Sequence, residues 1–245
     1  LQGEVVSPKN VGGVVGNLEG ALVKQVSRLD GEDISAGTEL VKLMGVTTTT
    51  IHARGSENVG GVVGLASSNS EVLDTRNYIS VEGRTAVGGI VGRAGTGTKV
   101  TLAQNSEPIN GKALSSEAVK ALTGTTLAYN ALQLDKSKID GCYIGGIVGR
   151  GDNTVQVTMA KNDPLIIEEF KELQLDDVYT DKYALGGNDE TAVSGKSYVG
   201  GITGAYGIVN YSINTGKIDG IKIIGGVSGS GYRITNSFNT ADVIG

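Results

Sequence analysis

A six-residue pattern occurs six times in the chain: an apolar residue, Gly-Gly, a second apolar residue, a variable residue and a further Gly. The copies are NVGGVVGN from residue 10, NVGGVVGL from 58, AVGGIVGR from 86, YIGGIVGR from 143, YVGGITGA from 198 and IIGGVSGS from 223. The flanks are also alike, because a glycine usually stands four residues before the first apolar residue. An internal repeat encodes one structural unit several times, so it constrains the fold more than any other feature.

The spacing of the copies indicates the size of that unit. Their first apolar residues lie 48, 28, 57, 55 and 25 positions apart. The short intervals, of 25 to 28 residues, suit one coil of a β-solenoid, in which a few short strands stack on the next coil at roughly 4.8 Å. Apolar residues make up 39% of the chain and aromatics only 4%, which favours strands of small, β-branched residues. We therefore predict an all-β fold, a parallel β-solenoid of about six glycine-rich coils.

Glycine accounts for 39 of the 245 residues, against a typical share of roughly 7%. At the corner of a coil the backbone needs either a positive φ or a close approach to the next coil, and glycine supplies both without a clash at Cβ. We expect the valines and isoleucines between the glycines to fill the interior. The predicted structural glycines are Gly12, Gly13, Gly16, Gly60, Gly61, Gly64, Gly88, Gly89, Gly92, Gly145, Gly146, Gly149, Gly200, Gly201, Gly204, Gly225, Gly226 and Gly229.

The three long intervals predict insertions that enter at an equivalent point of their coils. We place them at approximately residues 28–50, 106–137 and 163–191 of a single domain spanning residues 1–245. Each contains a short segment that reads as a helix: TELVKLMG from residue 38, SEAVKALTG from 116 and DPLIIEEFKEL from 163. Insertions at one corner of neighbouring coils project on one side. The alternative is that each long interval contains an additional coil without the motif.

Several chemical functions are excluded by the residues available. The glycines are not followed by the Lys-Ser/Thr pair of a phosphate-binding loop, and no apolar run is long enough for a membrane span. The net charge of −5, with acidic and basic residues interspersed, argues against a nucleic-acid partner. His52 is the only histidine and Cys142 the only cysteine, so neither a zinc site nor a histidine-dependent triad is expected. We predict no cofactor and no catalytic residue.

Carboxylates provide the one serious enzyme alternative, since glycoside hydrolysis uses paired carboxylates and calcium sites use oxygen ligands. The weak metal candidates are Asp176, Asp177 and Asp181; further acidic pairs are Asp30 with Asp33 and Asp189 with Glu190. Their spacing matches no defined calcium loop, which favours a solvated acidic surface. Arg150-Gly151-Asp152 matches the integrin-binding tripeptide, but Arg93 occupies the same place in another copy, which favours ordinary coil sequence.

The motif NVGGVVG, AVGGIVG and YIGGIVG, followed by ITNSFNTADV, resembles the GLUG motif of large bacterial surface and secreted proteins. These include adhesins and the non-catalytic regions of IgA-specific metalloendopeptidases. The resemblance covers all six motif cores and the last two strands that follow them, and not the insertions. It implies a right-handed parallel β-helix located outside the cell or on the bacterial surface, and no catalytic residue of the family has a counterpart here.

These observations together predict a non-enzymatic adhesin or ligand-binding module. We expect the insertion-bearing side to bind a host surface protein or glycan, and neighbouring domains of a longer polypeptide to cap both ends, without membrane insertion. One alternative is a structural stalk or spacer that carries a catalytic domain elsewhere in the polypeptide. Another is a β-helix enzyme that degrades polysaccharides.

Overall fold

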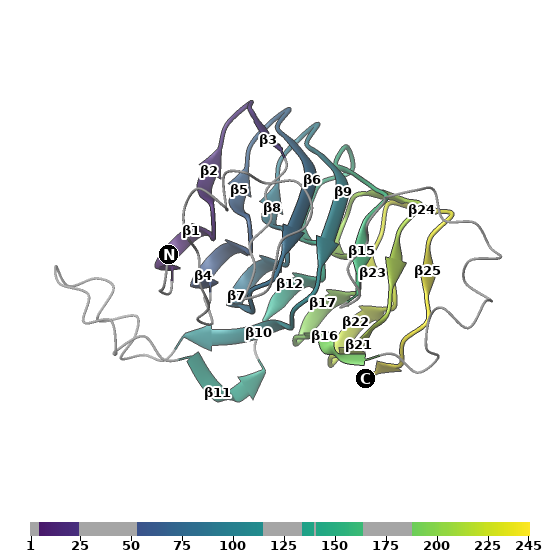
Figure 1. Ribbon diagram of the computed structural model, residues 1–245. Coiled ribbons are helices and arrows are strands. Elements are labelled where there is room, and N and C mark those ends of the chain that lie inside the picture. The colour runs from purple at the N-terminus through teal and green to yellow at the C-terminus, as the bar shows by residue number, and fades with distance from the viewer. Residues whose placement is uncertain (1–4, 25–52, 115–133, 140, 164–187) are drawn as a thin grey trace, which may run out of the picture.

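The computed structural model describes residues 5–24, 53–114, 134–139, 141–163 and 188–245 of the chain. Strands are the only regular elements in these residues, and they form three curled sheets around a common interior (Figure 1). Apart from the antiparallel pair β10–β11, every strand pairing is parallel. The described part is thus an all-β, solenoid-like stack, as the repeat predicted. The three predicted helices lie outside the described residues except for Asp163, the first residue of the third, which is not helical.

Sheet A contains the strands that lead into each motif. Its members are β1 (Val5–Gly12), β4 (Ala53–Gly60), β7 (Val81–Gly88), β10 (Ile109–Leu114), β11 (Leu134–Ile139), β12 (Cys142–Gly145), β16 (Asn188–Ser194), β17 (Ser197–Gly200), β21 (Gly216–Asp219), β22 (Lys222–Gly225) and β26 (Val243–Ile244). In the second and third coils one long strand, β4 or β7, crosses the whole sheet. In the later coils the same path is divided between two shorter strands, such as β10 and β12.

Sheet B begins directly after each Gly-Gly pair and has one strand for each motif. These strands are β2 (Val15–Leu18), β5 (Val63–Ala66), β8 (Val91–Ala94), β13 (Val148–Arg150), β18 (Thr203–Ala205) and β23 (Ser228–Ser230). Their order in the sheet is their order in the chain. The strands on either side of each long interval are hydrogen-bonded neighbours, as β2 is with β5 and β8 with β13. This register excludes the alternative in which a long interval adds a coil to the stack.

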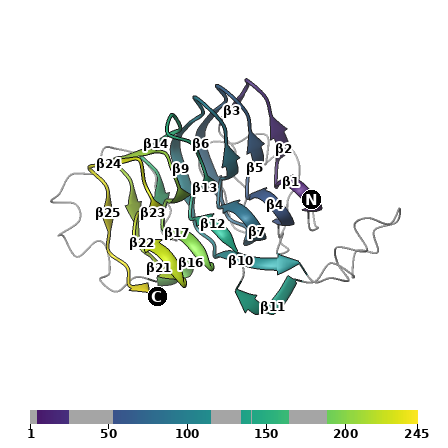
Figure 2. The same cartoon turned by 180° about the vertical axis from the view of Figure 1, so that it is seen from behind.

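Sheet C closes each coil. Its strands are β3 (Leu22–Lys24), β6 (Glu71–Asn77), β9 (Lys99–Asn105), β14 (Gln156–Thr158), β15 (Lys161–Asn162), β19 (Ile208–Asn210), β20 (Ile213–Asn214), β24 (Arg233–Thr235) and β25 (Phe238–Asn239). The view from behind shows the sheets running side by side from β1 at one end of the stack to β25 at the other (Figure 2). A coil therefore passes through sheets A, B and C before the next one begins.

The interior is filled by β-branched residues stacked in register. Under sheet A, Val59, Val87, Ile144 and Val199 occupy one position of successive coils and are fully buried. A second apolar cluster lies against sheets B and C, and includes the other apolar residue of each interior motif, such as Ile90. The prediction that the motif's apolar residues fill the interior is therefore confirmed for Val87 and Ile90. Side chains this short suit a narrow coil, which explains the scarcity of aromatic residues.

Two insertion boundaries differ from those expected. Residues 109–111, which the sequence analysis included in the second insertion, pair in parallel with β7 and continue sheet A. Gly111 pairs with Gly83, so it takes the place of the glycine that stands four residues before the motif in other copies, and Gly141 packs directly against it. At the other end of the third insertion, β16 already begins at Asn188. Local sequence similarity could not locate these strands, because their pairing partners lie in other coils.

Candidate functional site

The first glycine of each motif allows the tight corner between sheets A and B. A Cβ atom at Gly88 would collide with the carbonyl oxygen of Val91 and would lie 2.7 Å from the Ile147 carbonyl oxygen of the next coil. The same collision with the residue three positions later occurs in all six copies. These glycines do not have positive φ angles. Close approach of the backbone, one of the two reasons expected from the sequence, is the one that applies.

The left-handed backbone conformation belongs instead to the residue that precedes each motif's first apolar residue. In all six copies this residue has φ between 53° and 63°; the residues are Asn10, Asn58, Ala86, Tyr143, Tyr198 and Ile223. The third glycine accommodates the resulting bulge, since a Cβ at Gly92 would lie 2.5 Å from the Asn58 carbonyl carbon of the preceding coil. Only asparagine among these residue types favours such an angle, so the sequence carried little signal for it.

The second glycine of the motif makes room for a buried asparagine of the same coil. A Cβ atom at Gly89 would lie 2.6 Å from Cγ of Asn105, and one at Gly146 would lie 2.6 Å from Cγ of Asn162. The equivalent asparagines form a ladder through the stack, which we call the asparagine ladder; its members are Asn77, Asn105, Asn162, Asn214 and Asn239. The stretch ITNSFNTADV contains one of these asparagines, Asn239, but its residue types alone do not indicate this role.

Each rung of the asparagine ladder is joined to the next by a side-chain hydrogen bond. The amide nitrogen of Asn105 donates to Oδ1 of Asn162 at 2.8 Å, and that of Asn162 donates to Oδ1 of Asn214 at 2.6 Å. The same nitrogen of Asn105 also donates to the carbonyl oxygen of Glu107. Every interior rung is thus a satisfied buried polar group. The ladder is a structural device and offers no reactive group.

Arg150-Gly151-Asp152 is held within the coil. Arg150 pairs in register with Arg93, as the comparison of the copies predicted. Oδ2 of Asp152 accepts a hydrogen bond from Oγ1 of Thr96 at 2.7 Å, and Oδ1 accepts from the backbone and hydroxyl of Thr154. Partial burial alone would raise the pKa of Asp152, but these hydrogen bonds outweigh burial and lower it. Both carboxylate oxygens are engaged, which argues against display of the tripeptide to a receptor.

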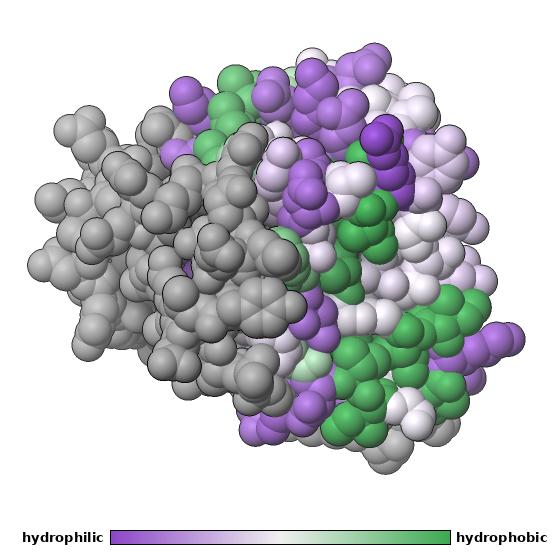
Figure 3. All heavy atoms as spheres, turned by 90° about the vertical axis from the view of Figure 1, so that its right-hand side faces the viewer, coloured by the Kyte–Doolittle hydropathy of each residue, from purple (hydrophilic) through white to green (hydrophobic). Residues whose placement is uncertain are grey.

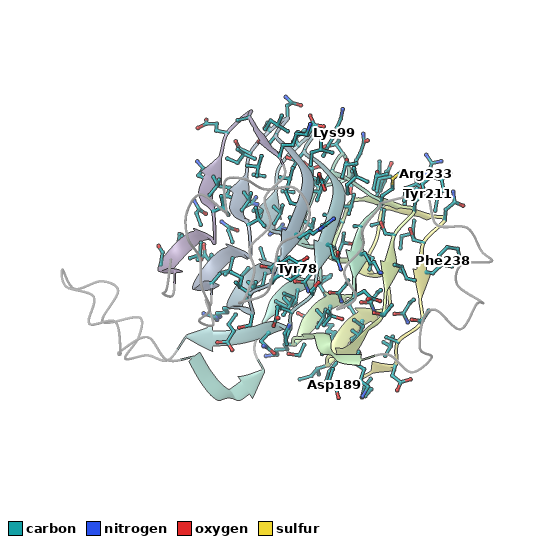
Figure 4. The ribbon with its side chains drawn as sticks, in the orientation of Figure 1. Tyr78, Lys99, Asp189, Tyr211, Arg233 and Phe238 are labelled. Atoms are coloured by element: carbon teal, nitrogen blue, oxygen red, sulfur yellow. The ribbon has the colours of Figure 1, made fainter. Side chains whose placement is uncertain are left out.

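The remaining candidate residues are dispersed. Sγ of Cys142 accepts a hydrogen bond from Oγ of Ser197 at 3.1 Å. Asp189, at the lower edge of the stack in Figure 4, forms an ion pair of 3.0 Å with Lys217. His52, the acidic pair Asp30 and Asp33, and the weak metal candidates Asp176, Asp177 and Asp181 all lie outside the described residues. Among the residues that the structure does describe, no group of three or more His, Cys, Asp or Glu side chains could hold a metal ion.

A buried polar cluster anchors the chain where the third insertion begins. Nζ of Lys161 lies 3.7 Å from Oδ1 of Asp163, and Oγ1 of Thr215 donates to Oδ2 of the same carboxylate at 2.7 Å. The side chains of Gln104 and Ser106 donate to the carbonyl oxygen of Asp163. Four coil residues therefore hold Asp163, so the base of this insertion is fixed to the stack.

An aromatic and cationic cluster lies on the outside of the corner between sheets A and B. The rings of Tyr143 and Tyr198 are stacked with centroids 4.8 Å apart, and Cζ of Arg150 lies 4.7 Å from the centroid of Tyr143. Arg93 is exposed at the position equivalent to Arg150 in the preceding coil. We call these four residues the tyrosine–arginine corner. Sequence analysis missed it, because its tyrosines and arginines come together only through the register of coils.

The last coil exposes the largest collection of apolar side chains among the described residues. Figure 3 looks onto this end of the stack and shows a broad hydrophobic area. Its exposed members are Ile221, Ile223, Tyr232, Ile234, Val243 and Ile244. Ile234 is 44% exposed, whereas Val209, its partner in the preceding coil, is fully buried. Val243 is likewise the register partner of the buried Ile218, so Ile234 and Val243 of the apolar surface belong to the uncovered inner face of the last described coil.

Comparisons with known proteins identify no relative of the chain. In the described residues, no helix has the length and apolar character needed to cross a membrane. No family model matches the sequence, and the searches of curated proteins and of solved structures likewise produced no match.

Proposed function

We propose that the chain is a right-handed β-solenoid segment of a bacterial surface or secreted protein and acts as a non-enzymatic binding module. Support for the right-handed coil comes from the resemblance of its motif to GLUG repeats and from the strong preference of parallel crossovers for that hand. The binding surface is the side that carries the insertions. Its partner is a host surface protein or glycan.

The observation that carries this proposal is where the chain leaves the stack. The described chain breaks off after Lys24, Leu114 and Asp163 and resumes at Ala53, Leu134 and Asn188. These three gaps fall between the start of sheet C and the middle of sheet A, whereas sheet B has a described strand in all six coils. We therefore propose that the three intervals supply the recognition surface, because loops carried by a rigid scaffold commonly do so.

The pairing of β10 with β11 suggests how to remove one insertion cleanly. Leu114 and Leu134 are partners in this antiparallel pair, so residues 115–133 can be replaced by Asn-Gly, the preferred sequence of a two-residue hairpin turn. The original chain and this variant are applied to an array of glycans and extracellular-matrix proteins. We expect a specific signal that the variant loses while it keeps its thermal unfolding midpoint. A signal that survives removal of each insertion in turn contradicts the proposal.

The second candidate function is a spacer. The unbroken register of sheet B over six coils is the observation that favours it, because a continuous stack transmits a fixed length between its two ends. A spacer predicts no signal on the array from either version of the chain. Release of soluble sugar from any glycan on the array would instead establish the enzyme alternative.

A further inference from the structure

The tyrosine–arginine corner has an electrostatic arrangement that the fold does not require. Arg93 and Arg150 are partners in neighbouring parallel strands, a pairing that puts two positive charges at adjacent positions roughly 4.8 Å apart along the stack. Like charges directly opposite each other destabilise a sheet. The other coils avoid this at the same position, which they fill with Asn17, Leu65, Ala205 and Ser230.

The neighbouring carboxylates do not neutralise the two arginines. No described acidic side chain forms an ion pair with Arg93 or Arg150. Asp152, two residues after Arg150, uses both of its oxygens in the bonds to Thr96 and Thr154. Glu57 on sheet A forms an ion pair of 3.2 Å with Lys9. The pair of guanidinium groups thus remains available to an anion from solution.

The tyrosines provide the second half of a binding surface. Tyr143 lies against both Tyr198 and the guanidinium group of Arg150. This contact holds Arg150 in place, so its side chain loses less conformational entropy when a ligand binds. Tyr143 and Tyr198 are partly exposed. The negative face of an aromatic ring attracts weakly positive C–H groups, such as those on one face of a sugar ring.

We propose that the tyrosine–arginine corner binds an anionic oligosaccharide, with a carboxylate or sulfate between Arg93 and Arg150 and another sugar ring of the same oligosaccharide against Tyr198. Guanidinium groups match the planar, two-oxygen geometry of these anions. The net charge of the chain is −5, so a polyanion gains no overall electrostatic attraction and a local site is needed to hold it. This corner is formed by described residues of sheets A and B, and the proposal does not depend on insertion-mediated binding.

The repeat supplies the substitutions that test the site. Arg93→Ala and Arg150→Ala introduce the residue that Ala205 provides in the next coil, and Tyr198→Asn introduces the residue found at Asn10 and Asn58. The matched control is Lys99→Gln with Arg233→Gln, two exposed cations on sheet C, labelled in Figure 4. Both double variants change the net charge from −5 to −7, since each removes two positive charges.

The experiment measures the Kd of three hexasaccharides by fluorescence anisotropy: a heparin-derived one, an oligogalacturonate and a neutral chitin fragment. We expect at least one anionic probe to bind and the neutral one not to bind. The arginine double variant should lose about tenfold or more in affinity, Tyr198→Asn about threefold to tenfold, and the control pair less than about twofold. The two anionic probes distinguish recognition of sulfate from recognition of carboxylate.

Four outcomes would overturn the proposal. Equal losses in the two double variants would show diffuse electrostatic attraction. Equal affinity for the neutral probe, or no binding of any anionic probe at about 1 mM, would show that the corner is not an anion site. The variant with residues 115–133 replaced should keep the affinity, and its loss would assign the anion to an insertion. Circular dichroism and thermal unfolding verify that every variant remains folded.

Discussion

The third and sixth coils carry the same motif and differ in what surrounds it. In the third coil, Val87 and Ile90 are completely buried; in the sixth, the equivalent Ile224 and Val227 are only partly buried. The residue types are nearly the same, so the difference arises from the neighbours. An interior coil is covered on both sides, whereas the sixth has a described neighbour on one side only. The comparison shows that burial in this fold is a property of position in the stack.

The largest difference in the free energy of unfolding is expected between a charge placed in sheet C of the fifth coil and one placed in sheet C of the sixth. Val209 and Ile234 are register partners, and the first is buried while the second is exposed. Val209→Lys should lower the free energy of unfolding by more than about 4 kcal/mol, because an unpaired charge would enter the interior. Ile234→Lys should change it by less than about 1 kcal/mol. Chemical denaturation followed by circular dichroism measures both, and equal losses would contradict the comparison.

Alanine at the first motif glycine tests how far the neighbouring coil constrains the corner. At Gly88 a Cβ atom would collide with the Val91 carbonyl oxygen. It would also lie 2.7 Å from each of two backbone atoms of the next coil. At Gly225 it would meet only Ser228 closely, with the next nearest residue 3.7 Å away. We expect Gly88→Ala to cost about 3 kcal/mol and Gly225→Ala about 1 kcal/mol. If thermal unfolding shows the same cost for both, the corner itself, rather than the stack, requires glycine.

Removal of a rung from the asparagine ladder should have a smaller effect. Asn105→Ala removes hydrogen bonds to Asn77, Asn162 and Glu107 in a fully buried region. The expected loss is about 2 to 3 kcal/mol. Asn239 accepts from Asn214, donates to Ala241 and is only partly buried, so Asn239→Ala should cost about 1 kcal/mol. Urea unfolding of the two variants provides the measurement, with Asn153→Ala, at an exposed turn, as the control.

The smallest effect concerns pH and the hydrogen bonds that Asp152 accepts from Thr96 of the preceding coil and from Thr154. The hydrogen bonds from Thr96 and Thr154 lower the pKa of Asp152 below its ordinary value of 3.8. A carboxylate with a lowered pKa stabilises the fold above its unfolded-state value and loses that contribution as the pH falls through the folded value. Stability should therefore decrease below about pH 4, and Asp152→Asn should weaken this decrease. If the variant's stability depends on pH in the same way as that of the original chain, the hydrogen bonds of Asp152 contribute nothing measurable to stability.

Much of the repeat architecture could be predicted from residue types and spacing. Six motifs with β-branched residues between glycines indicated a parallel, coil-on-coil fold, because only one residue type tolerates the close approach seen at Gly88 and Gly92. The positions of positive φ could not be predicted in the same way. Tyr143 and Ile223 adopt it just as Asn10 does, so the position in the coil, and not the residue type, sets this angle.

The candidate site was less accessible from the sequence. The motif for integrin binding was visible, and its interpretation as ordinary coil sequence agrees with the pairing of Arg93 and Arg150. The tyrosine–arginine corner was not visible, because Arg93 and Tyr198 are 105 residues apart in a chain whose intervals vary. They belong to one surface only because their coils are stacked in register, with the coil of Tyr143 and Arg150 between them.

The sequence by itself determined the number of coils, the residues that fill them and the places where backbones touch, because each of these depends on local residue size repeated at a short spacing. The tertiary structure alone decided which residue carries the left-handed angle, where Ile109–Gly111 joins sheet A, and which side chains of different coils form a surface. These depend on register between strands far apart in the chain. Register is set by hydrogen bonds between coils, and no single coil contains that information.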